Sequence, residues 1–581
     1  MGGRFRRRLE TRPVYLTSRA ASAIQQAVSI GSEPTTAEAV TRPDRGGIVV
    51  TLVRPSANYF EYDFMAPATP PIGLAYVAAA IAAHGYDARV IDGLGEAPQR
   101  FTYFKDLGIK RNGIADEEII ARIAPETRAI GVTCMFSYDW PFVRNLIEAI
   151  RPCFPDVPIV VGGEHATAMP GFVLTDCPAV DVVVRGEGEE TICELLDALI
   201  SGDDLSDVAG LTYRKGGEIV STAARRRIRA IDKIPRPRWD LVPIDNYLDQ
   251  GLGFGVSRGR HMPIIATRGC PYQCTFCSNP AMWTTAWKPR EPDAVLDEVE
   301  DYLARYRATN IDFYDLTLIV DPRWLKRFAR GITERGLTFT WQLPSGTRSE
   351  AIDAEVAALL YETGCRNLNL APESGSPRML RIIKKKVSLP RLLATTRQCL
   401  DAGLNVKVNF IVGFPQERLW DLVQTGWLAI RMAAMGVHDS AVAIFSPYPG
   451  SEIFEDLYGK DHSRLDDEFF LSLGAYSDMS KMGTAWSRLN PYVVTTSRFL
   501  IFIAFYGVSF LVRPGRVVRL VRELFSPQQT SRGATVLRRM FNRKRAPRTY
   551  APSPKLRLLR AADCARVAPS GIRARVGPIS S

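Results

Sequence analysis

Residues 267–277 read Thr-Arg-Gly-Cys-Pro-Tyr-Gln-Cys-Thr-Phe-Cys and hold three of the ten cysteines of this 581-residue chain. Cys270, Cys274 and Cys277 are spaced C-x3-C-x2-C, so one short loop presents three thiolates. Three thiolates suit three irons of a 4Fe–4S cluster and leave the fourth iron open to another ligand. Structural zinc is the alternative, but it needs a fourth protein ligand, and the loop itself offers none.

The cysteine loop follows the first of six expected strands. These strands lie at residues 262–267, 311–316, 339–344, 367–371, 406–412 and 441–445, with helical stretches between them. Six strand–helix pairs in about 200 residues fall short of a complete eight-fold barrel. The pattern predicts a partial, TIM-like (β/α)6 barrel over residues 256–455.

The cysteine loop and the strand ends around it resemble the radical SAM superfamily. Its signature has this cysteine spacing and an aromatic residue, here Phe276, before the last cysteine. The resemblance implies that Cys270, Cys274 and Cys277 are the catalytic residues and the metal ligands of the cluster. It also implies contacts to SAM from Phe276, Asp315, Arg348, Glu373, Ser374, Ile411 and Gly413, although Asn409 and Gln416 depart from the fifth-strand motif.

Short apolar strands also alternate with helices over residues 47–205, which predicts a doubly wound, Rossmann-like parallel sheet in an α/β protein. Ligands of such sheets lie beyond the carboxyl ends of the strands. The loops here hold Pro70-Pro71-Ile72-Gly73, Thr133-Cys134-Met135, Gly162-Gly163 and Arg185-Gly186-Glu187-Gly188-Glu189. These motifs resemble the cobalamin-binding domain that often precedes a radical SAM barrel. By that resemblance, cobalamin contacts Pro71, Gly73, Thr133, Gly162, Gly163, Glu164, His165, Gly186, Glu187 and Gly188.

The match to the cobalamin-binding domain is incomplete. The Asp-x-His-x-x-Gly motif, which supplies a histidine to the lower face of the cobalt, is absent from the chain. The resemblance therefore assigns no lower cobalt ligand. The alternative interpretation is a Rossmann-like domain that serves only as a scaffold.

The basic residues are concentrated at the two ends of the chain. The formal net charge is +12, yet residues 513–581 hold 17 Lys and Arg against 2 acidic residues, and residues 1–46 hold 8 Arg against 4 acidic residues. The part between them is mildly acidic, unlike the basic folded surface of a nucleic-acid enzyme. We therefore expect no nucleic-acid partner, a disordered basic leader over residues 1–46 and a disordered basic tail over residues 526–581.

Two further segments complete the expected organisation: a hairpin and linker at residues 206–255, and a mostly helical region at residues 456–525. In the latter, residues 499–512 form a 14-residue run of apolar, Gly and Ser residues, whereas a bilayer of about 30 Å needs about 20. Arg513, Arg516, Arg519 and Arg522 then alternate with apolar residues, as in helices that lie on anionic membranes. Membrane contact is one interpretation, and an ordinary core helix is the other.

The resemblance implies an enzyme that cleaves SAM reductively to a 5′-deoxyadenosyl radical, with a 4Fe–4S cluster, SAM and cobalamin as cofactors. We favour methylation of an unactivated carbon of a small-molecule or lipid substrate. The alternative is ring formation without methyl transfer, as in the group around the anaerobic magnesium-protoporphyrin monomethyl ester cyclase. A non-catalytic iron–sulfur and cobalamin-binding scaffold is the hypothesis from a different class. The expected partner is an electron donor such as flavodoxin or ferredoxin, and the expected location is the cytoplasm, with peripheral membrane contact as an option.

Overall fold

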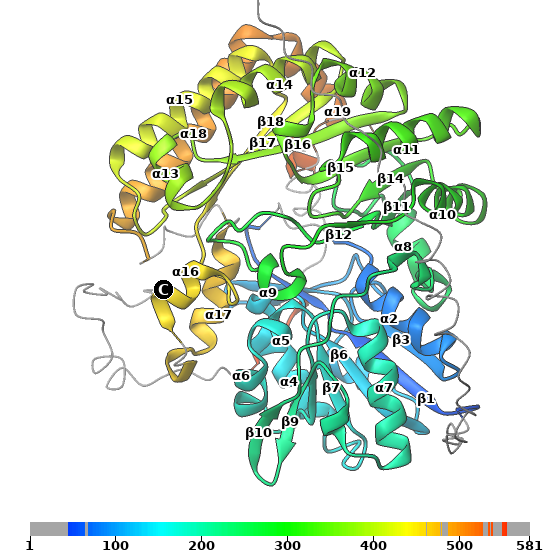
Figure 1. Cartoon of the computed structure of the whole chain (residues 1–581). Helices are drawn as coiled ribbons and strands as arrows, with labels where there is room; N and C mark the ends of the chain where they lie inside the picture. Colours follow the sequence, from blue (N-terminus) through cyan, green and yellow to red (C-terminus); the bar gives the residue numbers. More distant parts are fainter. Residues whose placement is uncertain are drawn as a thin grey trace, which may run out of the picture. The chain divides into compact units, whose positions relative to one another are not determined.

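The computed structural model describes residues 45–63, 68–459, 462–476, 478, 486–526, 531, 533–534, 536–538 and 549–554. Two large sheets organise this part of the chain: a mainly parallel sheet built from residues 49–221 and a parallel sheet built from residues 261–444 (Figure 1). The predicted basic leader, apart from its last two residues, lies outside the described residues, and so does most of the predicted basic tail.

The first sheet has seven strands in the order β10-β9-β8-β7-β6-β1-β3. Its five parallel strands are β1 (Val49–Arg54), β3 (Asp87–Asp92), β6 (Thr127–Thr133), β7 (Ile159–Gly162) and β8 (Val182–Val184). They are rich in buried Val and Ile because helices cover both faces of the sheet. β1 lies between β3 and β6, so the direction of winding reverses there, and such a switch point is where these sheets bind ligands. The doubly wound prediction is confirmed.

The helices of this domain form two layers. On one face of the sheet, α2 (Ile72–Ala83) packs against α7 (Gly188–Ser201). The other face is covered by α3 (Asp116–Ile120), α4 (Trp140–Ile150), α5 (Glu164–Ala168) and α6 (Pro170–Asp176).

The edges of the first domain differ from the prediction. The hairpin of β9 (Leu211–Lys215) and β10 (Glu218–Ser221) pairs with β8, so it extends the sheet and is not part of the linker. A small antiparallel sheet of β2 (Ala57–Phe60), β4 (Phe101–Phe104) and β5 (Ile109–Asn112) is absent from the predicted elements, because four-residue strands with interspersed polar residues give no apolar pattern.

The prediction of a disordered tail is wrong for one short segment. β19 (Thr549–Tyr550) pairs in parallel with the edge strand β4, and the rings of Tyr550 and Tyr103 lie 5.8 Å apart. An unpaired edge strand offers free backbone groups to any extended segment within reach. The composition of the tail gives no sign of this pairing.

The second sheet contains the six parallel strands predicted for the barrel, in sequence order: β11 (His261–Ile264), β14 (Asn310–Phe313), β15 (Thr340–Thr347), β16 (Cys365–Glu373), β17 (Asn405–Val412) and β18 (Asp439–Ile444). The connecting helices are α10 (Pro292–Arg305), α11 (Pro322–Glu334), α12 (Ala354–Glu362), α14 (Leu389–Asp401) and α15 (Leu419–Met435). Shorter elements are α8 (Ile244–Leu248) in the linker and β12 (Thr267–Arg268), α9 (Asn279–Trp283), β13 (Lys288–Pro289) and α13 (Pro377–Ile382) near the strand ends. The partial (β/α)6 barrel is confirmed.

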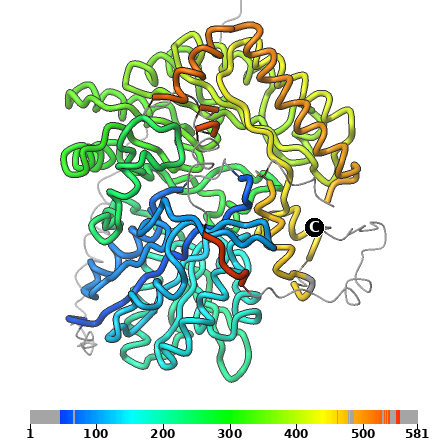
Figure 2. Tube along the Cα trace, turned by 180° about the vertical axis from the view of Figure 1, so that it is seen from behind, coloured from blue at the N-terminus to red at the C-terminus, as the bar shows by residue number. Residues whose placement is uncertain are grey.

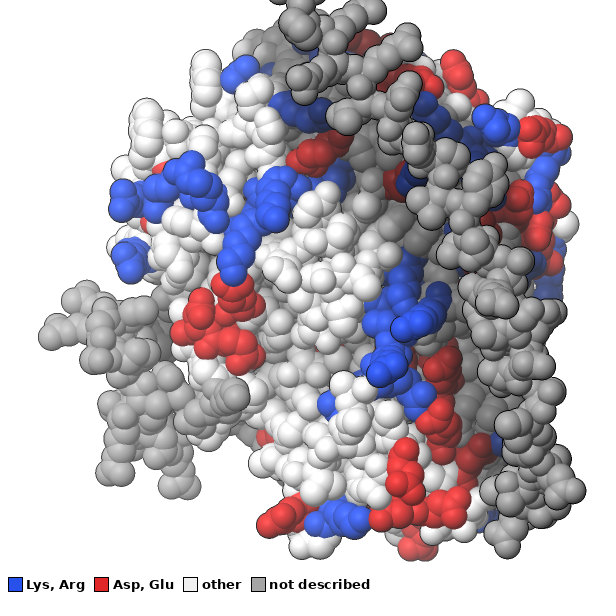
Figure 3. Space-filling view, viewed as in Figure 1, with Lys and Arg blue, Asp and Glu red and all other residues white. Residues whose placement is uncertain are grey.

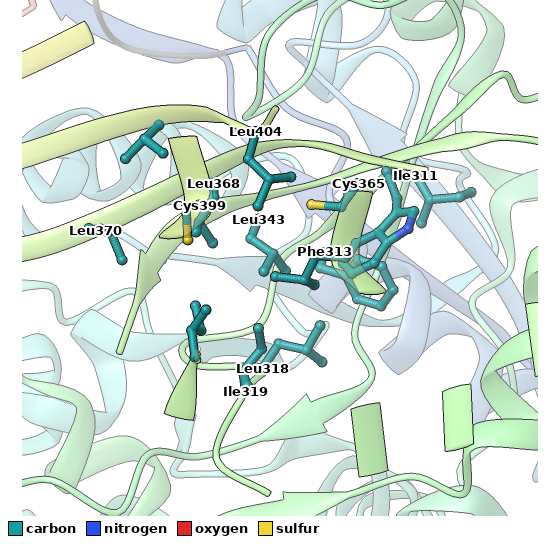
Figure 4. Close-up of a cluster of buried hydrophobic side chains, with 14 of the residues drawn as sticks. Ile311, Phe313, Leu318, Ile319, Leu343, Cys365, Leu368, Leu370, Cys399 and Leu404 are labelled. Atoms are coloured by element: carbon teal, nitrogen blue, oxygen red, sulfur yellow. The ribbon is translucent and has the colours of Figure 1, made fainter. Parts of the chain in front are cut away.

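The apolar core of the barrel lies between its strands and its helices. Leu368 and Leu370 of β16 pack there with Phe313 of β14 and Cys399 of α14 (Figure 4). Successive side chains of a strand face opposite sides of the sheet, so Asn369 faces the interior of the barrel. Apolar side chains thus fill the outer layer, and polar ones are left to line the inside.

The carboxyl-terminal helices pack on both domains. α16 (Glu452–Tyr458) and α17 (Asp467–Leu473) insert aromatic side chains into the core of the first domain. The buried Arg144 of α4 donates two hydrogen bonds of 2.7 Å to the carboxylate of Asp467. This ion pair fixes α17 against the helices of the first sheet.

α18 (Pro491–Val512) has 22 residues, so the helix starts well before the predicted 14-residue apolar run. Asn490 caps it through its side chain, and the proline at its first position suits a helix start. It is the one helix of the described residues that is long and apolar enough to cross a membrane. However, one face packs alongside α15 and β18 (Figures 1 and 2), and the buried Arg498 donates to the carbonyl oxygen of Val442 at 3.0 Å. α18 is therefore docked on the barrel, and α19 (Gly515–Leu524) follows it.

Candidate active site

The cysteine loop leaves the first barrel strand through β12. Gly269 has a φ of 88°, and a Cβ at this position would lie 2.2 Å from the carbonyl oxygen of Ala286, so the turn requires glycine. Thr275, in the middle of the loop, donates its backbone N–H to Ile383 (3.1 Å) and accepts from the N–H of Ile453 (2.9 Å). The loop is thus held between the end of α13 and the start of α16.

The three cysteines are half-buried on this loop. Burial raises the pKa of each thiol, that of Cys277 to about 12, whereas the cations Lys385 and Arg348 act in the opposite direction on Cys270 and Cys274. Metal ligands must be deprotonated, so these cations favour the ligating form. Among the described residues, no three Cys, His, Asp or Glu side chains are already gathered as a metal site. The assignment of the three ligands therefore rests on the loop and its spacing.

Asp315 follows β14 and lies beside the start of the cysteine loop. Its buried carboxylate accepts hydrogen bonds from the backbone N–H groups of Ala266 (3.2 Å) and Thr267, and from the hydroxyl of Thr267 (2.6 Å). Burial raises the pKa of Asp315 to about 6. Asp315 thus holds the loop in place, and its expected contact with SAM stays a prediction.

Arg348 and Glu373 also lie next to the loop. The guanidinium carbon of Arg348 is 3.8 Å from the centroid of the Tyr272 ring, and the side chain donates to the carbonyl oxygen of Lys386. Glu373 ends β16 with a left-handed φ of 66°, and its carboxylate pairs with the amine of Lys385 at 3.0 Å. A left-handed residue other than glycine is strained, and such strain concentrates at functional sites.

The other predicted SAM residues lie at the ends of β16 and β17 or on the loop. Ser374 is buried, and its hydroxyl lies 3.2 Å from a threonine hydroxyl of α15. Phe276 and Ile411 belong to one apolar cluster beside the loop. Gly413 follows β17 with a φ of 89°. All seven predicted SAM residues are therefore found at the carboxyl-terminal end of the barrel strands.

Buried polar atoms without a hydrogen-bond partner mark the interior of the barrel. Within the described residues they include Nη1 of Arg348, Oδ1 of Asn369, Oδ1 of Asn409 and Oγ of Ser446. These residues lie on, or directly after, the four consecutive strands β15 to β18. An unpaired buried polar group is costly, so this set fits a polar ligand such as SAM. Asn369 and Ser446 are absent from the sequence-based set, because a single polar residue at a strand carries no signal of its own.

Glu417 gives the site a predicted pH dependence of stability. Its carboxyl group accepts from the N–H of Gly413, and burial raises its pKa from 4.5 to about 8. Between these pH values the native state binds more protons than the unfolded chain, so stability falls as the pH rises. We expect Glu417→Gln to raise the thermal unfolding midpoint by several degrees at pH 8 and to change it little at pH 4.5, measured by calorimetry. Equal effects at both pH values would contradict this account.

The predicted cobalamin residues gather at the carboxyl ends of the first sheet. Thr133, at the end of β6, pairs with Gly162 at the end of β7. A Cβ on Gly162 would find its nearest neighbour at 4.0 Å, whereas one on Gly163 would lie 2.4 Å from the carbonyl oxygen of Cys134. A Cβ on Gly162 would thus fit in ordinary van der Waals contact, whereas Gly163 is required by the backbone itself.

Four more predicted cobalamin residues lie at the starts of α2 and α7. Pro71 precedes α2, Gly188 begins α7, and Gly186 donates its N–H to the hydroxyl of Thr167 at 3.0 Å. Around Gly73 and Gly186, a Cβ would meet no atom of the structure within 4 Å. These two positions therefore also leave room at the sheet edge.

Two apolar side chains that the sequence analysis missed are exposed at the same edge. Met135 and Phe136 directly follow β6 and are 47% and 54% exposed. A small cavity of about 20 Å³ beside β2 and α4 is lined by Asn58, Tyr59, Phe60, Asp63, Ile109, Tyr138, Phe142, Leu471, Gly474 and Tyr476. Met135 and Phe136 lie just beyond the end of β6, beside the switch point where sheets of this kind bind ligands. They fit a large planar cofactor such as cobalamin.

His165 lies in the core of the first domain. Its ring centroid is 5.2 Å from that of Trp140 and 5.6 Å from that of Phe470, and its Nδ1 lies 3.0 Å from the hydroxyl of Ser137. Burial lowers the pKa of His165 to about 3, so the ring is neutral. These contacts support a packing role, and a contact with cobalamin stays a prediction.

Glu164 links the two predicted cofactor loops. It begins α5, directly after the glycine pair of β7, and accepts a hydrogen bond from the hydroxyl of Ser278. Ser278 follows Cys277, and the helices α5 and α9 pack against each other. Glu164 and Ser278 are 114 positions apart in the chain, so no local pattern could show this contact.

Arg268 forms a second link between the domains. Its guanidinium donates to Glu187 (3.1 Å) and Glu189 (2.6 Å) and lies over the rings of Tyr76 and Trp283. Arg268 and both carboxylates are buried. Glu187, which the resemblance assigns to cobalamin, is thus engaged by a cation just before the cysteine loop.

Loss of this cation is expected to destabilise the protein. Arg268→Gln leaves Glu189 buried without its partner, and breaking a buried ion pair costs about 3–5 kcal/mol. The thermal unfolding midpoint should fall by several degrees. Arg323→Gln, which removes an exposed pair with Asp321, is the control and should leave the midpoint unchanged. Identical unfolding midpoints for the two variants would show that the interaction of Arg268 with Glu187 and Glu189 does not contribute to stability.

Two family models match the chain at these two domains. The B12 binding domain matches residues 65–196, and the Radical SAM superfamily matches residues 264–426. An uncharacterized methyltransferase from Pyrococcus horikoshii is 31% identical over 386 residues, which cover 66% of this chain and 78% of the relative. The chain belongs to the cobalamin-dependent radical SAM enzymes.

Further comparisons agree with this family. The anaerobic magnesium-protoporphyrin IX monomethyl ester cyclase of Cereibacter sphaeroides is 27% identical over 396 residues, covering 67% of this chain and 60% of the cyclase. The solved structure of the radical SAM methyltransferase TsrM from Kitasatospora setae, with cobalamin and a 4Fe–4S cluster bound, matches with a TM-score of 0.56 at 19% identity, over 71% of this chain and 75% of TsrM. TsrM therefore shares the fold. The predicted family, fold class and cofactors (a 4Fe–4S cluster, SAM and cobalamin) are confirmed for this radical SAM enzyme.

Proposed function

We propose that this enzyme methylates an unactivated carbon of a small-molecule or lipid substrate. The contact between Glu164 and Ser278 carries the proposal, because it brings the cobalamin loop against the cysteine loop. A group transfer needs donor and acceptor held together in one geometry. When bound, the cluster and SAM supply a carbon-centred radical that activates the substrate, and cobalamin supplies the methyl group.

The chain's own residues would hold and shield these groups. Cys270, Cys274 and Cys277 are the proposed cluster ligands, and the unpaired polar atoms of β15 to β18 are proposed to hold SAM. The carboxyl end of the first sheet, with Gly162 and the open positions Gly73 and Gly186, would accept the cobalamin. Radical chemistry also needs a site closed to water. Two contacts support exclusion of water from one side of the site: the packing of α5 on α9, and the backbone hydrogen bond from Ile453 of α16 to Thr275 of the cysteine loop.

Two products of SAM test the proposal. Anaerobically reconstituted enzyme is supplied with cobalamin, methyl-deuterated SAM and a reductant. A methylase should form both S-adenosylhomocysteine, from methyl donation, and 5′-deoxyadenosine, from reductive cleavage, and deuterated methylcobalamin should be found by mass spectrometry. Absence of S-adenosylhomocysteine would contradict methyl transfer.

Ring formation without methyl transfer is the second candidate. The similarity to the Cereibacter sphaeroides cyclase covers two thirds of this chain, about the same share as the similarity to the Pyrococcus horikoshii methyltransferase. In that case the same assay should yield 5′-deoxyadenosine alone. A chain that forms neither product would be a scaffold.

The electron for SAM cleavage is proposed to come from a flavodoxin or ferredoxin. Cys270 and Cys274 are not fully buried, so a small redox protein can approach the loop. Photoreduced flavodoxin should support formation of 5′-deoxyadenosine in place of a chemical reductant, and failure to do so would exclude this donor. Peripheral membrane contact is likewise a proposal. It rests on the exposed side of α15, α18 and α19, and not on the cysteine loop.

A further inference from the structure

The outer side of the barrel carries an apolar stripe along α15. Leu419, Trp420, Val423 and Trp427 are exposed, and the two tryptophans, 67% and 61% exposed, lie two helical turns apart. The opposite side of α15 packs into the barrel core. Large exposed tryptophans are unusual on a surface that meets only water.

The neighbouring helix α18 continues this apolar surface. Its buried side, which includes Ile501 and Phe505, faces the barrel, while Leu500, Ile503 and Leu511 are exposed, Leu511 by 83%. α15 and α18 lie alongside each other and run in the same direction, since Gly413 lies near Val494 and Gly436 lies near Arg513. The two exposed stripes therefore form one surface.

α19 presents its apolar side outward as well. Arg516 points inward, where it donates to the carbonyl oxygens of Val437 (2.7 Å) and Gly436 (2.6 Å) at the end of α15, and Glu523 is buried. Val518, Val521 and Phe525 are exposed, Phe525 by 86%. The usual arrangement of an amphipathic helix is thus reversed. The expectation that all four arginines face a membrane is therefore wrong for two of them. Arg513 and Arg516 donate hydrogen bonds to backbone carbonyl oxygens at the end of α15 and in the loop after it.

The exposed charges on these three helices have one sign. Within the described residues, the exposed charged side chains of α15, α18 and α19 are Arg431, Arg519 and Arg522, while Asp421, Arg498 and Glu523 are buried. In Figure 3 the region of α15 and α18, at the upper left, is mostly white and blue. An apolar surface with only positive charges complements an anionic leaflet.

We infer that this surface, the exposed side of α15, α18 and α19, binds the leaflet of an anionic phospholipid membrane. The binding is peripheral, because the buried side of α18 and Arg498 stay on the barrel. α15 begins just after the end of β17, so the surface reaches the rim of the barrel that holds the cysteine loop. If the proposed function holds, an apolar substrate can pass from the leaflet to this rim.

The experiment is flotation of the full-length, reconstituted protein with vesicles of phosphatidylglycerol and phosphatidylcholine, or of phosphatidylcholine alone. Wild type should float with the anionic vesicles only. Leu500→Ser with Ile503→Ser should reduce binding at least tenfold, and Arg519→Gln with Arg522→Gln by roughly 25-fold, at about fivefold for each arginine. Ile219→Ser, at an exposed apolar residue of β10, is the matched control and should bind as wild type does.

Tryptophan fluorescence gives a second readout. Trp420 and Trp427 should be quenched by brominated acyl chains, and the quenching should disappear in the variant with both residues changed to Phe. Wild type that stays unbound, or binding that survives both double variants, would overturn the proposal. A dimer that Leu500→Ser with Ile503→Ser converts to monomer, without vesicle binding, would assign the surface to a second copy of the chain. None of these outcomes depends on SAM cleavage, so they test the surface apart from the proposed function.

Discussion

Anaerobically reconstituted protein is expected to hold about four irons per chain, and the variant with Cys270, Cys274 and Cys277 all changed to Ala is expected to hold none. The three thiolates are the only cysteines on the loop between β12 and α9. Without them the cluster has no ligands, so SAM cleavage should fall to background. Iron analysis and electron paramagnetic resonance of the reduced protein measure the result.

An exposed cysteine outside the loop supplies the control for this experiment. Cys153→Ala should retain the full iron content, because Cys153 lies in the turn after α4 in the first domain. A cluster that persists in the triple variant would refute the assignment of the three ligands.

The second large effect, loss of bound cobalamin, is expected from a change at the carboxyl end of the first sheet, where the predicted cobalamin residues lie. Gly162→Trp fills the space in which a Cβ now finds its nearest neighbour at 4.0 Å, so bound cobalamin should be lost from the absorbance spectrum while the iron content is unchanged. Gly162→Ala adds one methyl group without a clash and should fold and bind cobalamin. Gly507→Trp, where a Cβ meets no atom within 4 Å on α18, is the matched control.

Two outcomes would count against this edge as the cofactor site. One is normal cobalamin absorbance in Gly162→Trp, which would move the binding site elsewhere. The other is wild-type protein that binds no added cobalamin, which would favour the scaffold interpretation of the first domain.

The strands of the two large sheets could be predicted because their apolar residues form continuous or alternating patterns, which is what a strand with one or two buried faces requires. β8 reads Val-Val-Val, and β17 alternates Val406, Val408 and Phe410 with residues that face the barrel interior. The small sheet of β2, β4 and β5 could not be predicted, since strands such as Ile109–Asn112 carry charged residues. The start of α18 was equally hidden, because Thr495 and Thr496 interrupt the apolar run but not the helix.

The candidate site could be predicted where its residues belong to a motif. The spacing of the loop indicates Cys270, Cys274 and Cys277, and Gly162 is assigned by its resemblance to the glycine pair of the cobalamin-binding domain. The hydrogen bonds of Arg268 with Glu187 and Glu189 join positions 81 and 79 residues apart. Contacts between such distant positions leave no pattern in the sequence. The unpaired Oδ1 of Asn369 became visible only in the structure, where the strands around it form the barrel.

The most direct test of the account is the formation of 5′-deoxyadenosine from SAM by the reconstituted enzyme under anaerobic conditions. The account predicts that this product forms only when a reductant is present, and that it disappears in the triple cysteine variant but not in Cys153→Ala. Protein that holds an intact 4Fe–4S cluster and is reduced, yet yields no 5′-deoxyadenosine, would contradict the central claim that this chain is a radical SAM enzyme.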